Sequence, residues 1–383
     1  MDVSVGSKIS IVRSRRVVTG NTISPADIII KDGKIMGIQP WGKQTVTIGS
    51  QLLDAGDLVV MPGIIDPHVH VNEPGRSDWE GYSTATRAAA AGAQHSAGYF
   101  QGKAHLWTRN SLPPTTSVSN FHTKLKAAEG QCFVDVAFWG GVIPDPMLYE
   151  TFLASRPPNM EVAAVEAVAN LQYKVRCHIV HLSSAMALPI IRKAKKAGAP
   201  LSVETTHHYL TLSAEKIPPG ATYFKFCPPV REHSNKEALW NSLLQGHIDM
   251  VVSDHSPCTP DLKLLQDGDF LKAWGGICSL QLGSFLFWSS ARTHGFSLLD
   301  IPRLLSSNPA KLCSVDDRKG TIKPGYDADL VILDPDKEYQ EKSLHHKNKL
   351  TPYQGFQLWG EIEATIVGGI LVYYKGRHCP VPA

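Results

Sequence analysis

The chain has 383 residues, of which 43% are hydrophobic, enough to bury a large core as one barrel-sized domain with an appendage or as two smaller domains. Its 38 basic and 35 acidic residues are interspersed and give a formal net charge of +3, so the composition shows no extended nucleic-acid surface. No apolar run approaches the ~20 residues of a membrane span, and the N-terminus lacks the apolar centre of a signal peptide, so we expect a soluble, intracellular protein.

The first 58 residues alternate short apolar runs with turns. Isoleucine-rich runs flank the turn Asp32-Gly33, a pattern that predicts a β-hairpin. Apolar strand patterns return far along the chain, at residues 329–334 and 362–373. Two strand-rich ends around a mixed middle predict one small β-sandwich domain made of residues 1–58 and 315–383.

An apolar strand predicted over residues 58–65 leads directly into Asp66-Pro67-His68-Val69-His70. Side chains alternate along a strand, so His68 and His70 point to the same side and can share one metal ion. The turn at 72–75 ends the strand, which places the pair at a carboxyl edge, where barrel enzymes keep their chemistry. A chance His-x-His in a loop is the alternative, but the buried strand and the aspartate before the pair favour metal binding.

Between the two ends, strands alternate with helices, as is typical of βα units around a parallel sheet. Residues 59–314 are therefore predicted to form a barrel domain. Its further strands are expected at residues 132–139, 175–180, 201–204 and 248–253. One helix is expected to start at the cap Ser183-Ser184 and to end at Gly198, and another to start at the capping box Ser234-x-x-Glu237 and to end at Gly246.

Five motifs follow one another in the order found in the cyclic amidohydrolases, the group of dihydroorotases, hydantoinases and allantoinases. They are residues 66–74, 178–184, 203–210, 252–257 and 319–330. The chain resembles this family over about four fifths of its length. Within the group it is similar to the allantoinases in Asn72, where dihydroorotases carry arginine, and in residues 204–208 and 345–352.

The resemblance implies an α/β fold, the TIM-like (β/α)₈ barrel of metal-dependent hydrolases with a small β-sandwich from both termini. It also implies hydrolysis of a cyclic amide, by which allantoin is opened to allantoate in purine catabolism. Carried over from the family, His68 and His70 bind the first metal and His181 binds the second. Asp254 would be a ligand of the first metal and the catalytic proton shuttle. Aspartate more often caps helices or turns, but a buried strand directly precedes this one.

The same resemblance also implies roles for further positions. Substrate contacts are expected from Asn72 and from loops containing Cys227 and Gly275, although this glycine can instead serve only a turn. The pair His207-His208 is expected to shape the pocket rather than to bind metal. The pair His345-His346 is expected to be structural.

The chain also departs from the family in two places. Near residues 144–145 the family has two further βα units, which carry the carboxylated lysine that bridges the two metals and one more histidine ligand; neither is found here. Residues 93–109, where the family has an apolar strand, show no strand period, so their His95 and His105 are expected to lie in an exposed loop and not to replace metal ligands. Only five of eight barrel strands are clear, and the barrel is therefore predicted to be incomplete.

Two classes of function remain open at this point. The first is a metal-dependent hydrolase of allantoin, with hydantoinase or dihydroorotase activity as a lesser alternative. The second is a catalytically defective isoform or a non-enzymatic scaffold comparable to the dihydropyrimidinase-related proteins. The resemblance implies zinc as the metal, with two ions in the family, a small-molecule substrate and a homotetramer. We expect no nucleic-acid or membrane partner. We expect a cytoplasmic location, with an organellar location left open. The seven cysteines, odd in number and without Cys-x-x-Cys, are expected to be reduced thiols.

Overall fold

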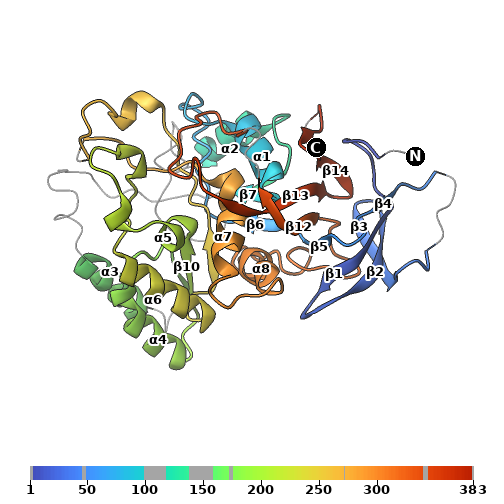
Figure 1. Ribbon diagram of the computed structural model, residues 1–383, viewed down its shortest axis with the longest axis horizontal. Helices are drawn as coiled ribbons and strands as arrows, with labels where there is room; N and C mark the ends of the chain where they lie inside the picture. The colour runs from blue at the N-terminus through green and yellow to red at the C-terminus, as the bar shows by residue number, and fades with distance from the viewer. Residues whose placement is uncertain are drawn as a thin grey trace.

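The computed structural model describes residues 3–44, 49–98, 118–137, 158–171, 176–270, 272–339 and 344–381. A mixed sheet lies at one end of the molecule, with both termini beside it, and helices α3 to α6 lie at the other end (Figure 1). Residues 99–109 of the stretch predicted to be altered, with His105 among them, lie outside the described residues, as does the predicted junction at 144–145.

Both ends of the chain contribute to one nine-stranded sheet in the order β15-β14-β13-β12-β5-β1-β2-β3, with β4 paired to β1. Its strands are β1 (Ile11–Thr19), β2 (Thr22–Lys31), β3 (Lys34–Pro40), β4 (Leu52–Asp54), β5 (Val59–Pro62), β12 (Leu330–Tyr339), β13 (Leu358–Val367), β14 (Ile370–Tyr374) and β15 (Arg377–His378). The predicted hairpin is confirmed, because Lys31 pairs with Lys34 across Asp32-Gly33. Both turn residues have positive φ, 50° and 75°, as a two-residue hairpin turn of this type requires.

The single strand predicted over residues 58–65 is wrong, because the chain forms two strands there. β5 lies between β1 and β12 in the terminal sheet, whereas β6 (Ile64–Asp66) belongs to a parallel sheet. The break falls at Pro62-Gly63, since proline has no N–H to donate to a sheet ladder. The N–H of Gly63 instead donates to the carbonyl of Asp329 at 3.0 Å. The residues that follow β6 are therefore connected to the terminal sheet through β6 and one linking residue, Gly63.

The parallel strands of the described residues form two three-stranded sheets, β6-β7-β8 and β11-β10-β9. Their strands after β6 are β7 (Gln94–Gly98), β8 (Asp135–Ala137), β9 (Cys177–Ile179), β10 (Leu201–Thr206) and β11 (Met250–Val252). Isolated parallel bridges from Val69 to His255 and from His255 to Ile277 link the two groups beyond the ends of β6 and β11. The four further strands predicted for the middle of the chain correspond to β8, β9, β10 and β11.

Residues 94–98 form a strand, so the prediction that they have no strand structure is wrong. This strand, β7, contains His95 and pairs in parallel with β6 on one side and β8 on the other. The chain enters it through Ala93, whose φ is 72°, and the side-chain amide of Gln94 donates to the carbonyl of Leu280 at 3.0 Å. Pairing on both edges thus outweighs the weak strand propensity of this sequence.

Helices surround the parallel strands. They are α1 (Tyr82–Ala91), α2 (Val118–Ala128), α3 (Pro158–Leu171), α4 (Leu188–Lys196), α5 (His207–Thr211), α6 (His233–Leu244), α7 (Gly283–Ala291), α8 (Asp300–Pro302) and α9 (Asn308–Leu312). Shorter 3₁₀ or π segments are η1 (Ala185–Ala187), η2 (Ala214–Lys216), η3 (Thr222–Phe224), η4 (Pro260–Lys263), η5 (Leu280–Leu282) and η6 (Arg303–Ser307). In the described parts of the chain, no helix combines the length and the apolar character that crossing a membrane would need. The seven cysteines all lie among the described residues and form no disulfide there.

The helix caps test two local predictions. The Ser184 hydroxyl accepts a hydrogen bond from the N–H of Met186 at 3.3 Å, which confirms the cap before η1 and α4. The capping box predicted at Ser234 is wrong, because α6 begins at His233 with Glu232 at the N-cap, two residues earlier, and has no side-chain cap. The carboxylate of Glu215 accepts the N–H of His233 instead, at 2.9 Å. A partner distant in the sequence replaces the local one.

Candidate metal centre

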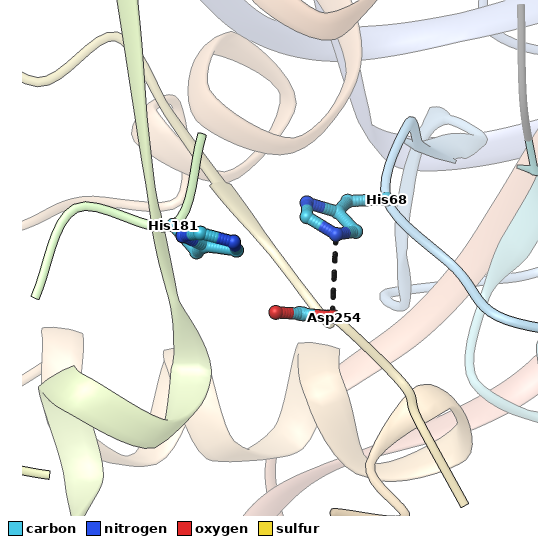
Figure 2. Close-up of side chains that lie close together, drawn as sticks. All are labelled: His68, His181 and Asp254. Atoms are coloured by element: carbon cyan, nitrogen blue, oxygen red, sulfur yellow. Dashed lines mark ion pairs between the residues drawn. The ribbon is translucent and has the colours of Figure 1, made fainter. Parts of the chain in front are cut away.

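Three strand ends bring the predicted metal-binding residues together. His68 and His70 follow β6, His181 follows β9 and Asp254 follows β11. All four side chains are buried or nearly so. Figure 2 shows the rings of His68 and His181 and the carboxylate of Asp254 turned toward one another. Residues separated by almost two hundred positions in the sequence thus meet at the carboxyl ends of the parallel strands.

The spacing of these groups fits one metal ion. The Oδ1 atom of Asp254 lies 3.3 Å from Nε2 of His68 and 3.1 Å from Nε2 of His70. Ligand atoms that share a tetrahedral zinc ion, with bonds of roughly 2.0–2.2 Å, lie about 3.3–3.6 Å apart. Ligand atoms of His68, His181 and Asp254 all lie within 4.8 Å of one another, and no other such group of three occurs among the described residues. The residues present therefore fit a metal ion, with His70 beside the group of three.

Hydrogen bonds to the backbone fix the loops that carry these ligands. The buried carboxylate of Asp66 accepts the N–H of His68 at 3.2 Å and the N–H of Ser253, also at 3.2 Å. The carbonyl of His255 accepts the N–H of His70 at 2.8 Å. Two residues that flank Asp254 are thereby tied to the two histidines after β6.

Several site residues adopt a left-handed backbone conformation. The φ angles are 40° at Asp254, 34° at His181 and 65° at Asn72. This conformation costs a residue other than glycine about 1 kcal/mol or more, and such residues cluster at functional sites. The surrounding hydrogen bonds must offset this strain.

The charges at the centre are strongly coupled. Burial lowers the pKa of His68, but the carboxylates of Asp254 and Glu204 outweigh it and raise that pKa to about 9. Burial raises the pKa of Asp254, but the neighbouring histidines hold it well below its usual range. Burial lowers the pKa of His70 and of His181. Without a metal, an ionised Asp254 therefore lies beside a protonated His68 at neutral pH, and metal binding must release that proton.

Glu204 is a residue of the centre that the sequence reasoning did not single out. It lies on β10, is 1% exposed, and its Oε1 is 2.6 Å from Nδ1 of His68. It is part of the motif at 203–210, and a charged residue inside an apolar strand predicted to be buried was the signal that could have revealed it.

The residues predicted to bind substrate lie in two places. Asn72 is buried next to the ligand loops, where its amide donates to the carbonyls of His70 at 3.3 Å and Pro257 at 3.4 Å. Its Oδ1 atom has no hydrogen-bond partner among the described residues. Cys227 and Gly275 lie against each other, because a Cβ at position 275 would be 3.0 Å from the cysteine sulfur.

The remaining histidine pairs do not join the group of three ligands. His207 packs against Gly283, since a Cβ on that glycine would lie 2.6 Å from its Nε2 atom. His208 is fully buried, with Nδ1 2.5 Å from the hydroxyl of Tyr353. His345 donates its backbone N–H to Gln281 at 2.8 Å, and Nε2 of His346 accepts the backbone N–H of that glutamine at 3.1 Å.

Comparisons with known proteins agree on one group of enzymes. A model of the amidohydrolase family matches residues 171–372. The mitochondrial allantoinase of Aquarana catesbeiana is 59% identical over 84% of this chain and 79% of its own length. The allantoinase of Streptomyces avermitilis is 38% identical over 96% of both chains. The solved L-hydantoinase (dihydropyrimidinase) of Arthrobacter aurescens superposes with a TM-score of 0.85 at 25% identity, over 96% of this chain and 97% of that chain.

The alignment with the Streptomyces avermitilis relative also measures a difference in length. It runs over 443 residues, whereas this chain has 383 in all. At least 60 aligned positions therefore face a gap in this chain. Because 96% of both chains is covered, the gaps are mostly internal.

Proposed function

The chain belongs to the amidohydrolase family, with allantoinases among its relatives, and from this membership we propose that it hydrolyses the cyclic amide of allantoin to give allantoate. The observation that carries the proposal is the group His68, His181 and Asp254, whose ligand atoms lie within 4.8 Å of one another with His70 3.1 Å from Asp254, in a chain 59% identical to an allantoinase. A defective isoform, a non-enzymatic scaffold and a hydantoinase or dihydroorotase are not favoured, because relatives named allantoinase come from widely separated organisms.

The residues of the centre have different roles in the proposed hydrolysis. A bound zinc ion supplies Lewis acidity and lowers the pKa of water at the site. His68, His70 and Asp254 would hold the first ion, and His181 would belong to the second. Asp254 is ionised in the metal-free site, so it is available both as a ligand and as the acceptor of the proton that water loses. The burial of all these groups excludes bulk water and strengthens their electrostatic effect.

Asn72 is proposed to contact the substrate. Its unpartnered Oδ1 is buried beside the ligand loops and can accept a hydrogen bond from an N–H of a cyclic ureide. Cys227 and Gly275 are proposed to line the same pocket, and a Cβ at position 275 would already lie 3.0 Å from the cysteine sulfur, closer than most such contacts.

We also propose that the barrel is incomplete and that its metal complement is reduced. The gap of at least 60 aligned positions supports the loss of internal segments. The division into residues 59–314 as the barrel domain and 1–58 with 315–383 as a β-sandwich stays a prediction, as do the homotetramer and the cytoplasmic location. The nine-stranded sheet joins both ends of the chain and supports one composite domain there, to which β5 also contributes.

The test is an assay of the purified chain, loaded with zinc, for conversion of allantoin to allantoate. We expect turnover that is lost on treatment with a chelator and restored by zinc. Hydantoin and dihydroorotate serve as competing substrates under the same conditions. Absence of turnover with allantoin, together with turnover of either competitor, would refute the proposed substrate.

A further inference from the structure

Glu204 lies between the two parts of the candidate metal centre. Its Oε1 atom is 2.6 Å from Nδ1 of His68, and its Oε2 atom is 3.0 Å from Nε2 of His178. The backbone N–H of His181 donates to Oε1 at 3.1 Å. One buried carboxylate on β10 therefore contacts two segments that carry ligands. They are the loop after β6, and β9 with the loop that follows it.

The chemistry of these contacts determines which nitrogen of His68 faces the centre. An ionised carboxylate accepts hydrogen bonds and cannot donate them, so Nδ1 of His68 must carry the proton that Glu204 accepts. Nε2 is then the nitrogen turned toward Asp254, 3.3 Å from its Oδ1. Metal-binding histidines use one neutral ring nitrogen, and a carboxylate on the other fixes the tautomer and raises the basicity of the ligand.

The carboxylate of Glu204 is itself held in place by His178, on the side away from His68. His178 lies between Glu204 and Ser202, with its Nδ1 atom 2.8 Å from the serine hydroxyl. The ring of this histidine and the N–H of His181 both come from the β9 region, so they restrain Glu204 from one direction. Asp66, the other buried carboxylate near His68, accepts the backbone N–H groups of His68 and Ser253 and so holds the two loops, whereas the carboxylate in contact with Nδ1 of the His68 ring is that of Glu204.

We propose that Glu204 is a positioning residue of the metal centre, which presents Nε2 of His68 to the metal and holds the backbone of His181 beside it. The inference rests on the metal site proposed above but not on the substrate. A chain that binds zinc without hydrolysing allantoin would refute the proposed function and leave this inference standing.

Titration of the full chain with zinc alone, in competition with a chromophoric chelator, tests the role. Glu204→Gln keeps the size of the side chain and one acceptor oxygen but removes the charge, and we expect zinc affinity to fall by about 10- to 100-fold. The matched control is Asp249→Asn. This carboxylate accepts the N–H of Val203, the residue before Glu204 on β10, and the ammonium of Lys195, so its loss disturbs the same strand without removing the hydrogen bonds of Glu204 to His68, His178 and His181. Its loss should leave zinc affinity within about threefold of the unmodified chain.

Cobalt(II) in place of zinc adds a readout that a purely structural role would not change. We expect the visible absorption bands of the cobalt form, which report ligand geometry, to shift in Glu204→Gln and to stay unchanged in Asp249→Asn. A loss of zinc affinity in Glu204→Gln no larger than in the control would overturn the inference.

A second measurement covers the case in which Glu204→Gln does not fold. A crystal structure of the unmodified chain with zinc should show Nε2 of His68 on the metal and Nδ1 on Glu204. Coordination through Nδ1, or a His68 ring turned away from this carboxylate, would overturn the inference whatever the variant does. A chain that binds no zinc would refute the metal site and the inference together.

Discussion

Asp27, on β2, offers a direct test of how the terminal sheet is held together. Its carboxylate is fully buried and accepts two hydrogen bonds from Arg13, at 2.7 and 2.9 Å. The N–H groups of Gly42 and Gln44 donate to the same carboxylate at 3.2 and 3.1 Å. This single group therefore fastens the β1–β2 hairpin and the chain that leaves β3.

Asp27→Asn should lower the free energy of unfolding by about 3 kcal/mol, since removing one partner of a buried ion pair costs roughly 3–5 kcal/mol. We take the lower end because the side chain of Arg13 is 15% exposed and its guanidinium also donates to the carbonyl of Gln44. The asparagine would also direct an N–H₂ group at groups that are themselves donors.

The cost should depend on pH. Burial raises the pKa of Asp27, but the hydrogen bonds from Arg13, Gln44 and Gly42 outweigh it and leave the pKa below the usual value. A depressed pKa stabilises the fold above the unfolded pKa of about 3.9, and this contribution is lost as pH falls through the folded pKa. The difference between the chain and its variant should thus be complete at neutral pH and shrink below about pH 4.

Urea unfolding followed by circular dichroism at pH 7 and at pH 3 measures both effects. Asp57→Asn is the matched control, because Asp57 pairs with Arg15 at 3.2 Å but its side chain is 80% exposed. Such an exposed pair contributes about 0–1 kcal/mol. A cost for Asp27→Asn that matches the control at pH 7, or that is the same at both pH values, would refute the reasoning.

Three further predictions concern the metal centre and the proposed missing segments. His68→Ala should abolish zinc binding and allantoin hydrolysis because it removes a ligand, whereas His95→Ala should leave both unchanged; calorimetry and the allantoate assay would reveal equal losses, which would contradict this. Elemental analysis of the purified chain should find fewer than two zinc ions per chain with at most one held tightly, because the bridging lysine and one histidine of the family are not found in the sequence. A chain in which the missing segments are restored from a relative should be more soluble and melt at a higher temperature, since parallel strands without neighbours leave open edges and exposed apolar surface; equal yield and melting of the two forms would argue against incompleteness.

Local sequence patterns predicted those parts of the fold that local interactions decide. The hairpin at Asp32-Gly33 follows from residues that tolerate positive φ, and the cap at Ser184 follows from a hydroxyl within reach of a nearby N–H. The ligands His68 and Asp254 could be predicted from the sequence because an apolar strand precedes each of them. Their meeting in space follows from the rule that parallel strands gather their carboxyl ends on one side.

The features that sequence reasoning missed depend on contacts between distant residues. β7 exists because it pairs with neighbours on both edges, and α6 starts early because Glu215 supplies an acceptor from another loop. The sequence near Asp254 does not predict its left-handed backbone. Hydrogen bonds from the surrounding loops hold a conformation that aspartate alone would rarely adopt. The role of Glu204 likewise becomes visible only once His68, far away in the sequence, lies beside it.

The place of β5 between β1 and β12 has a consequence for synthesis on the ribosome. β1 is made before β5, but the partner on the other edge begins at Leu330, which pairs with Pro62 across 268 positions of chain. At a translation rate of about 5–20 residues per second, this edge of β5 is without its partner strand β12 for roughly 13 to 54 seconds. His68 follows only six positions after Pro62, so the loop that carries it lacks its final support for the same interval. We expect the nascent chain to need chaperone protection over this period and to acquire its metal only after the C-terminal strands have been released.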